Sequence, residues 1–170
     1  TKDLFPYVDK MFDLFNATYE ALPSFVAISD LEKEYFKKKY LSFIDPEFIK
    51  FIVDKHDKLI WFAITMPSFS KAMQKANGKL FPFGFIHLLK AKKKCTDAIF
   101  YLIGVHPDYQ KKGVNAIVFA EFHKTFLEKG VVNCIRTPEL ASNKAVAALW
   151  KNFDPTIYKK RWTFTKTLTD

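Results

Sequence analysis

The segment Ile103-Gly-Val-His-Pro-Asp-Tyr-Gln-Lys-Lys-Gly-Val-Asn-Ala-Ile117 decides the fold that this sequence predicts. An almost unbroken apolar run over residues 98–105 predicts a buried strand, and the proline after it predicts a turn. A helix is then expected from about Lys112 to Lys129, ended by Gly130. Because the first amides of a helix lack intrahelical partners and a glycine lets a ligand approach the backbone, this opening favours a bound phosphate.

The same segment resembles motif A of the GNAT superfamily, the acyl-CoA-dependent N-acyltransferases. That motif reads Gln/Arg-x-x-Gly-x-Gly/Ala and follows a strand that ends in Val-x-Pro. Val105-His-Pro107 and Gln110-Lys-Lys-Gly113 match it. The last position differs, because Asn115 stands where the motif has Gly or Ala, and Ala116 follows one residue later. The bulkier Asn115 side chain could narrow a pyrophosphate pocket or donate a hydrogen bond of its own.

The elements expected after Gly130 follow the order of the C-terminal half of a GNAT fold. They are a strand over 131–136, a helix over 143–152 with Ser142 as its N-cap, and a strand over 157–166 in which Trp162 and Phe164 alternate with threonines. Within the helix, Asn143-Lys-Ala-Val-Ala-Ala-Leu-Trp150 resembles the family pattern Asn-x-x-Ala-x-x-Leu-Tyr. The resemblance covers residues 97–166 well and the N-terminal half loosely.

The resemblance implies an α/β fold with a mixed, mostly antiparallel central sheet flanked by helices. In it, the strand ending at Val105 splays from the 131–136 strand, and the pantetheine arm of coenzyme A lies between them. The implied activity is transfer of an acyl group, in the simplest case acetyl, from acetyl-CoA or another acyl-CoA to an amine. The implied cofactor-binding residues are Ile103, Val105, Gln110, Lys111, Lys112, Gly113, Val114, Asn115, Ala116 and Asn143.

Trp150 is a second departure from the family pattern. Relatives often carry a Tyr there that protonates the leaving thiolate, whereas an indole is only an N–H donor. The sequence therefore leaves two functions open: an N-acyltransferase, or a catalytically inactive GNAT-fold binding or regulatory module. No general acid or base is assigned, and the amine acceptor and the oligomeric state stay open.

The composition is consistent with one domain and an anionic partner. The chain has 170 residues, of which 19 are Phe, so an aromatic-rich core is expected. Lys and Arg number 27 against 18 Asp and Glu, and a net charge of +9 suits the phosphates of coenzyme A. Nucleic acid is a weaker candidate, because no platform of stacking aromatics interleaved with basic residues is evident.

No membrane partner or metal is expected. No apolar stretch approaches the roughly 20 residues that span a bilayer, and no secretory signal pattern is present. Cys95 and Cys134 show no metal-ligand spacing, and Cys134 is expected to be buried in its strand. A cytoplasmic location is the resulting expectation.

The N-terminal half predicts helices over 3–22 and 30–42, the second capped by Ser29, and a hairpin of strands over 48–54 and 59–66. No strand precedes the first helix, although the GNAT fold opens with one. We therefore expect residues 1–170 to be a single GNAT-like domain that forms the C-terminal part of a longer protein, with the missing strand supplied from upstream.

Residues 67–95 are expected to be a helical insertion between the hairpin and the strand of the phosphate loop. The pattern predicts short helices over 68–75 and 81–93, with Pro82 in the first turn of the second. Phe85, Leu88 and Leu89 are expected to face inward. Such an insertion would either overhang the acceptor side of the cleft or add to the core.

Overall fold

The computed structural model describes residues 4–22, 25–41 and 44–167. The chain forms two compact units, Thr1–Ile135 and Arg136–Asp170. The prediction that residues 1–170 make a single domain, and that they belong to a longer protein, stays a prediction.

The first unit is built on a four-stranded sheet in the order β1-β2-β3-β4. Strands β1 (Ile49–Val53), β2 (Leu59–Pro67) and β3 (Asp97–Val105) are antiparallel neighbours. The edge strand β4 (Asn133–Arg136) joins the sheet where the amides of Val132 and Asn133 donate to the Thr96 carbonyl. The mixed, mostly antiparallel sheet flanked by helices that the sequence predicts is confirmed.

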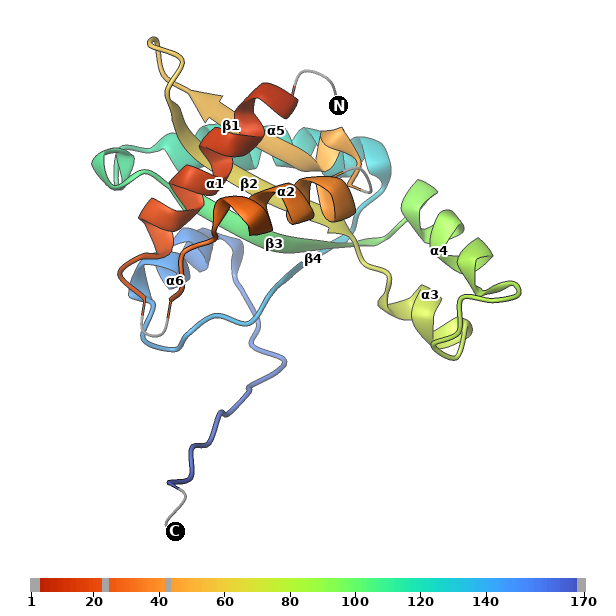
Figure 1. The fold of residues 1–170 in the computed structure, drawn as a ribbon. Coiled ribbons are helices and arrows are strands. Elements are labelled where there is room, and N and C mark those ends of the chain that lie inside the picture. Colours follow the sequence, from red (N-terminus) through yellow and green to blue (C-terminus); the bar gives the residue numbers. More distant parts are fainter. Residues whose placement is uncertain (1–3, 23–24, 42–43, 168–170) are drawn as a thin grey trace. The chain divides into compact units, whose positions relative to one another are not determined.

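Strand β2 is buried along almost its whole length, because helices cover both faces of the sheet (Figure 1). Helices α1 (Phe5–Tyr19) and α2 (Asp30–Phe36) lie on one face, and α5 (Val114–Lys129) lies on the other. Under α5 the core is aromatic: the Phe100 ring packs edge-on against Phe122, with ring centroids 5.2 Å apart. The many phenylalanines thus supply the large apolar area that a core of this size needs.

The two opening helices form as the local sequence predicts. The buried side of α1 carries Val8, Met11, Phe12 and Leu14. Ser29 caps α2 in a capping box, in which the Glu32 amide donates to the Ser29 hydroxyl and the Glu32 carboxylate accepts from the Ser29 amide. A π-helical turn over Lys37–Leu41 continues the helix, and its expected end at Ser42 lies outside the described residues.

Between β2 and β3 the chain forms a helical hairpin of α3 (Ser70–Lys75) and α4 (Gly84–Lys93), so the expected helices exist. Three details of the prediction are wrong. The second helix starts at Gly84, because residues 81–83 form a turn that contains Pro82. Phe85 and Leu89 are exposed, and Leu88 is only half-buried. The buried residues of the two helices are small, Ala72 and Gly84, and the large apolar side chains lie outside their contact.

The predicted boundaries around Gly130 need small corrections. Helix α5 starts at Val114 and not at Lys112, since Gly113 precedes it in a left-handed conformation, with φ 76°. Gly130, with φ 71°, ends the helix as expected. Cys134 is exposed and not buried, because it lies on the edge strand.

The second unit contains α6 (Lys144–Trp150), followed by a 3-10 turn over Lys151–Phe153. The strand expected over 157–166 is wrong: this segment has no regular structure and its side chains are exposed. Alternation of apolar and polar residues specifies which side chains share a face, but a strand also needs a neighbour to hydrogen-bond, which the pattern does not supply.

Candidate functional site

The site in the first unit begins where β3 ends. A 3-10 turn over Pro107–Tyr109 leads into a loop in which Lys111 and Gly113 both have positive φ, 61° and 76°, and α5 follows directly. Among the described residues, none accepts a hydrogen bond from the backbone amides of residues 111–115. Left-handed residues next to a helix start gather such amides into a concave cradle for an anion. Gly113 is open on its side-chain side: apart from its chain neighbours, no heavy atom lies within 4 Å of the position that a Cβ would take.

Along the last residues of β3, the backbone amide and carbonyl of every second residue point away from β2. The His106 amide donates to the Ile60 carbonyl, at 2.9 Å, so it faces β2. Because backbone groups alternate in direction along a strand, those of Ile103 and Val105 face the opposite side. The two residues expected to meet the pantetheine arm therefore present their amides and carbonyls away from β2.

Hydroxyls from the end of α1 reach the same carbonyls. The Tyr19 hydroxyl donates to the Ile103 carbonyl at 2.9 Å, and the Thr18 hydroxyl lies 3.5 Å from the Val105 carbonyl. The Gln110 side-chain amide also donates to the Val105 carbonyl, at 3.4 Å. Helix α1 thus contacts this stretch of β3 through polar groups, beside the cradle.

Asn115 does not face the cradle with a free side chain. Its Oδ1 accepts a hydrogen bond of 2.8 Å from the indole Nε1 of Trp61, a β2 residue that is fully buried. A buried indole N–H needs an acceptor, and Asn115 provides one. The Asn115 side chain is therefore directed to the sheet through its Oδ1, and its expected effect on a pyrophosphate pocket stays a prediction.

The loop is also tied to the β1–β2 hairpin. The Tyr109 hydroxyl donates to Asp54 Oδ2 at 3.1 Å, and this bond raises the pKa of Tyr109. The pKa of Asp54 is lowered, first by the backbone amide of Lys58 and also by His56 and Tyr109. The Lys112 ammonium lies over the Tyr109 ring at 5.3 Å from its centroid, so this cationic side chain contacts the turn that precedes the cradle.

The second unit holds Asn143 and Trp150. Asn143, and not Ser142, is the N-cap of α6: its Oδ1 accepts from the Val146 amide at 3.2 Å. The buried Trp150 donates its indole N–H to Glu139 Oε1 at 3.1 Å. Arg136 completes the cluster, with Nη1 3.1 Å from Glu139 Oε2 and its guanidinium over the Trp150 ring.

The structure therefore brings most of the predicted site residues together in one unit: Ile103, Val105, Gln110, Lys111, Lys112, Gly113, Val114, Asn115 and Ala116. Asn143 lies in the other unit, where it has a helix-capping role. Sequence reasoning missed Tyr19, Thr18 and Trp61, because their contacts with the site join residues far apart in the chain and no local pattern signals them. Among the described residues, no group of three or more His, Cys, Asp or Glu side chains could hold a metal ion.

Comparison with solved structures shows which fold this is. The chain is similar to a probable acetyltransferase, with 14% identity and a TM-score of 0.61 over 98% of this chain and 95% of that one. An aminoglycoside acetyltransferase from an uncultured soil metagenomic sample, in complex with sisomicin, gives 16% identity and a TM-score of 0.57 over 96% and 90%. AAC(6')-Iy, in complex with the bisubstrate analogue CoA-S-monomethyl-acetylneamine, has 11% sequence identity to this chain. The two align with a TM-score of 0.56 over 96% of this chain and 94% of that one. No family model matches the sequence, and no curated protein matches it. The resemblance to the GNAT superfamily is thus confirmed at the level of the fold.

Proposed function

We propose that this chain, which has the fold of GNAT acetyltransferases, binds an acyl-CoA and transfers its acyl group to an amine. The observation that carries the proposal is the cradle of unpartnered amides over residues 111–115, directly after the strand whose backbone faces away from β2 at Ile103 and Val105. A pyrophosphate is the anion that such a cradle suits, and the strand end offers backbone bonds to a pantetheine arm.

In the proposed reaction, the amine nitrogen attacks the thioester carbonyl, the C–S bond breaks, and an amide and free coenzyme A form. The ammonium proton passes to solvent or a base, and the thiolate takes up a proton as it leaves. Catalysis of this kind depends mainly on holding the two reactants in line and on a backbone N–H that polarises the carbonyl. We assign the thiolate proton to Tyr19, because its hydroxyl lies at the Ile103 carbonyl, on the strand end proposed to bind the pantetheine arm.

The test of acyl-CoA binding distinguishes loss of the amide cradle from loss of the folded structure. Acetyl-CoA binding is measured by calorimetry on the parent, on Gly113→Asp and on Gly113→Asn. Asp and Asn both tolerate a left-handed backbone, so they differ mainly in charge. We expect micromolar-range binding by the parent, a modest loss in the Asn variant and a loss of at least about tenfold more in the Asp variant, by like-charge repulsion with phosphate. Equal affinities in all three proteins, or no binding by the folded parent, would overturn the cradle.

Transfer is tested separately, by the release of free thiol from acetyl-CoA with a panel of small and peptide amines. The acceptor is not specified by the residues described. If an acceptor is found, Tyr19→Phe should lower kcat by about 100-fold with little change in the KM for acetyl-CoA, which is the signature of a lost proton donor. If Tyr19→Phe instead lowers kcat and raises the KM for acetyl-CoA by similar factors, Tyr19 has a positioning role.

The second candidate is a GNAT-fold module that binds acyl-CoA without turnover. It is favoured by Trp150, whose indole N–H is already engaged with Glu139 where relatives often carry a Tyr. Tight acetyl-CoA binding with no thiol release across the amine panel would select this function. Thiol release by the parent protein that is reduced in Tyr19→Phe would reject the module without turnover.

A further inference from the structure

The helical hairpin of α3 and α4 presents apolar side chains that its own packing does not use. The hairpin is closed through small residues: Ala72 and Gly84 are buried, and a Cβ on Gly84 would lie 1.8 Å from the Lys79 carbonyl oxygen and 3.0 Å from the Ala76 Cβ. The large apolar side chains stay outside, with Phe81 83% and Phe83 70% exposed. We call the exposed set the apolar tip; it comprises Met73, Leu80, Phe81, Phe83, Phe85, Ile86 and Leu89.

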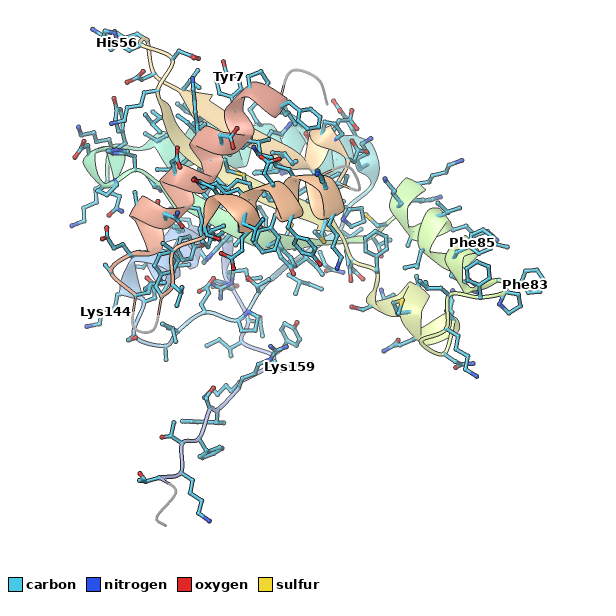
Figure 2. The ribbon with its side chains drawn as sticks, viewed as in Figure 1. Tyr7, His56, Phe83, Phe85, Lys144 and Lys159 are labelled. Atoms are coloured by element: carbon cyan, nitrogen blue, oxygen red, sulfur yellow. The ribbon has the colours of Figure 1, made fainter. Side chains whose placement is uncertain are left out.

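Figure 2 shows Phe83 and Phe85 at the end of the hairpin, directed away from the sheet to which it is attached. The Phe81 and Phe85 rings lie near one another, with centroids 6.4 Å apart. An exposed aromatic cluster of this kind is unusual on a monomeric surface and indicates a site of association.

The charge around the apolar tip has one sign. Residues 67–95 contain no Asp or Glu, and their seven lysines supply seven of the nine net positive charges of the chain. Lys71 pairs with Asp97 outside the segment, with Nζ 2.7 Å from Oδ2. The other lysines of the segment are Lys75, Lys79, Lys90, Lys92, Lys93 and Lys94.

We propose that the α3–α4 hairpin docks this protein on an anionic lipid surface, with the apolar tip in the headgroup layer and the lysines on acidic lipid headgroups. Aromatic and aliphatic side chains flanked by lysines are the chemistry that binds a peripheral protein to such a bilayer. This is contact with a surface and not a membrane span: none of the described helices is long and apolar enough to cross a bilayer. The sequence did not indicate it, because Phe85 and Leu89 were expected to face inward.

Other partners fit the hairpin less well. A second copy would bring two strongly basic segments together, and like charges repel. Proteins commonly bind nucleic acid through arginine side chains, and residues 67–95 contain no arginine. Aliphatic side chains such as those of Leu80 and Ile86 do not stack on bases. An acidic protein would complement the charge of the lysines, but it would also need a surface that accommodates the exposed rings of the apolar tip. Binding to an acidic protein is therefore one outcome of the test.

The first experiment is co-sedimentation of the full chain with vesicles of phosphatidylcholine alone and of phosphatidylcholine mixed with phosphatidylserine. We expect binding to the mixed vesicles only. Each lysine near an anionic surface contributes about fivefold in affinity, so Lys90→Glu/Lys93→Glu should weaken binding by about 25-fold or more. The matched control, Lys55→Glu/Lys58→Glu on the exposed β1–β2 loop, removes the same charge and should change binding far less.

The second experiment asks whether the tip itself enters the lipid. Phe83→Trp and the control Leu31→Trp, an exposed site on α2, are compared with the parent for fluorescence quenching by brominated phosphatidylcholine in mixed vesicles. We expect extra quenching from Phe83→Trp only. Phe81→Ser/Phe83→Ser should abolish sedimentation while leaving the thermal unfolding temperature unchanged, because both rings are exposed.

Three results would overturn the proposal: no sedimentation with mixed vesicles, an equal effect of the two charge reversals, or equal quenching from both tryptophan positions. Binding to poly-glutamate without binding to vesicles would replace the lipid surface with an acidic protein partner. Because no step uses acyl-CoA, failure here leaves the proposed transferase function untouched.

Discussion

Asn115→Ala should destabilise the fold, although Ala is the residue that the motif favours at this position. The substitution removes the acceptor of the Trp61 indole N–H, which lies at a fully buried residue. An orphaned buried donor costs about 1 to 3 kcal/mol, and Ala recovers up to about 0.7 kcal/mol as a better helix former. The expected net loss is about 0.3 to 2.3 kcal/mol, or about 1 to 9 °C in Tm for a chain of this size.

A double-mutant cycle with Trp61→Phe isolates this bond from the effects of propensity and of the smaller ring. Urea unfolding of the parent, both single variants and the double variant should give a coupling energy of about 1 to 3 kcal/mol between positions 61 and 115. Asn115→Asp is the matched control, since it keeps an oxygen acceptor and places a carboxylate at a helix N-terminus, where it is tolerated. A coupling energy below about 0.5 kcal/mol would refute the role given to Asn115.

Three further substitutions test the rest of the framework. Gly104→Ala would place a Cβ 2.2 Å from Phe62 Cε1, so overpacking should cost about 1 to 3 kcal/mol in urea unfolding; an unchanged midpoint would contradict the close approach. Ser29→Ala removes the cap of α2 and should cost about 1 kcal/mol, with Ser29→Thr as the variant that retains it. Lys71 and Asn133 hold the pKa of Asp97 below its ordinary value of 3.8, so its stabilising charge is present above about pH 4 and is lost as the pH falls through the lowered value. Asp97→Asn should accordingly be less stable than the parent at pH 7, by under about 1 kcal/mol after solvent screening, and the difference should shrink as the pH falls through the lowered pKa of Asp97; a difference independent of pH would exclude the charge as its cause.

Local patterns predicted what local interactions determine. The strand over 98–105, the turn at Pro107 and the glycine at the start of α5 were all readable because each depends on neighbours a few residues away. The Ser29 cap was readable for the same reason, since Glu32 lies three residues on. The fold followed from the order of these elements together with the GNAT resemblance.

The features that the sequence did not reveal depend on distant partners. The apolar spacing of Phe85 and Leu89 was compatible with an inward face, and only the close packing of small residues in the hairpin leaves them outside. The alternation over 157–166 predicted a strand for which the chain supplies no neighbour in the second unit. The contact of the Tyr19 hydroxyl with the backbone of β3 joins residues 84 positions apart, so no local pattern signals it.

The departure at Asn115 shows why a motif position should be judged by the direction of its side chain. A small residue matters there if the side chain would otherwise enter the space above the amide cradle. In this chain the Asn115 side chain turns to Trp61 instead, so the cradle is formed by backbone amides that the substitution leaves open. Because Trp61 needs an acceptor and Asn115 supplies it, the two residues form one compensating pair. Reduced phosphate binding is therefore expected from a charge at Gly113, where no side chain stands in the way, and not from the asparagine two residues later.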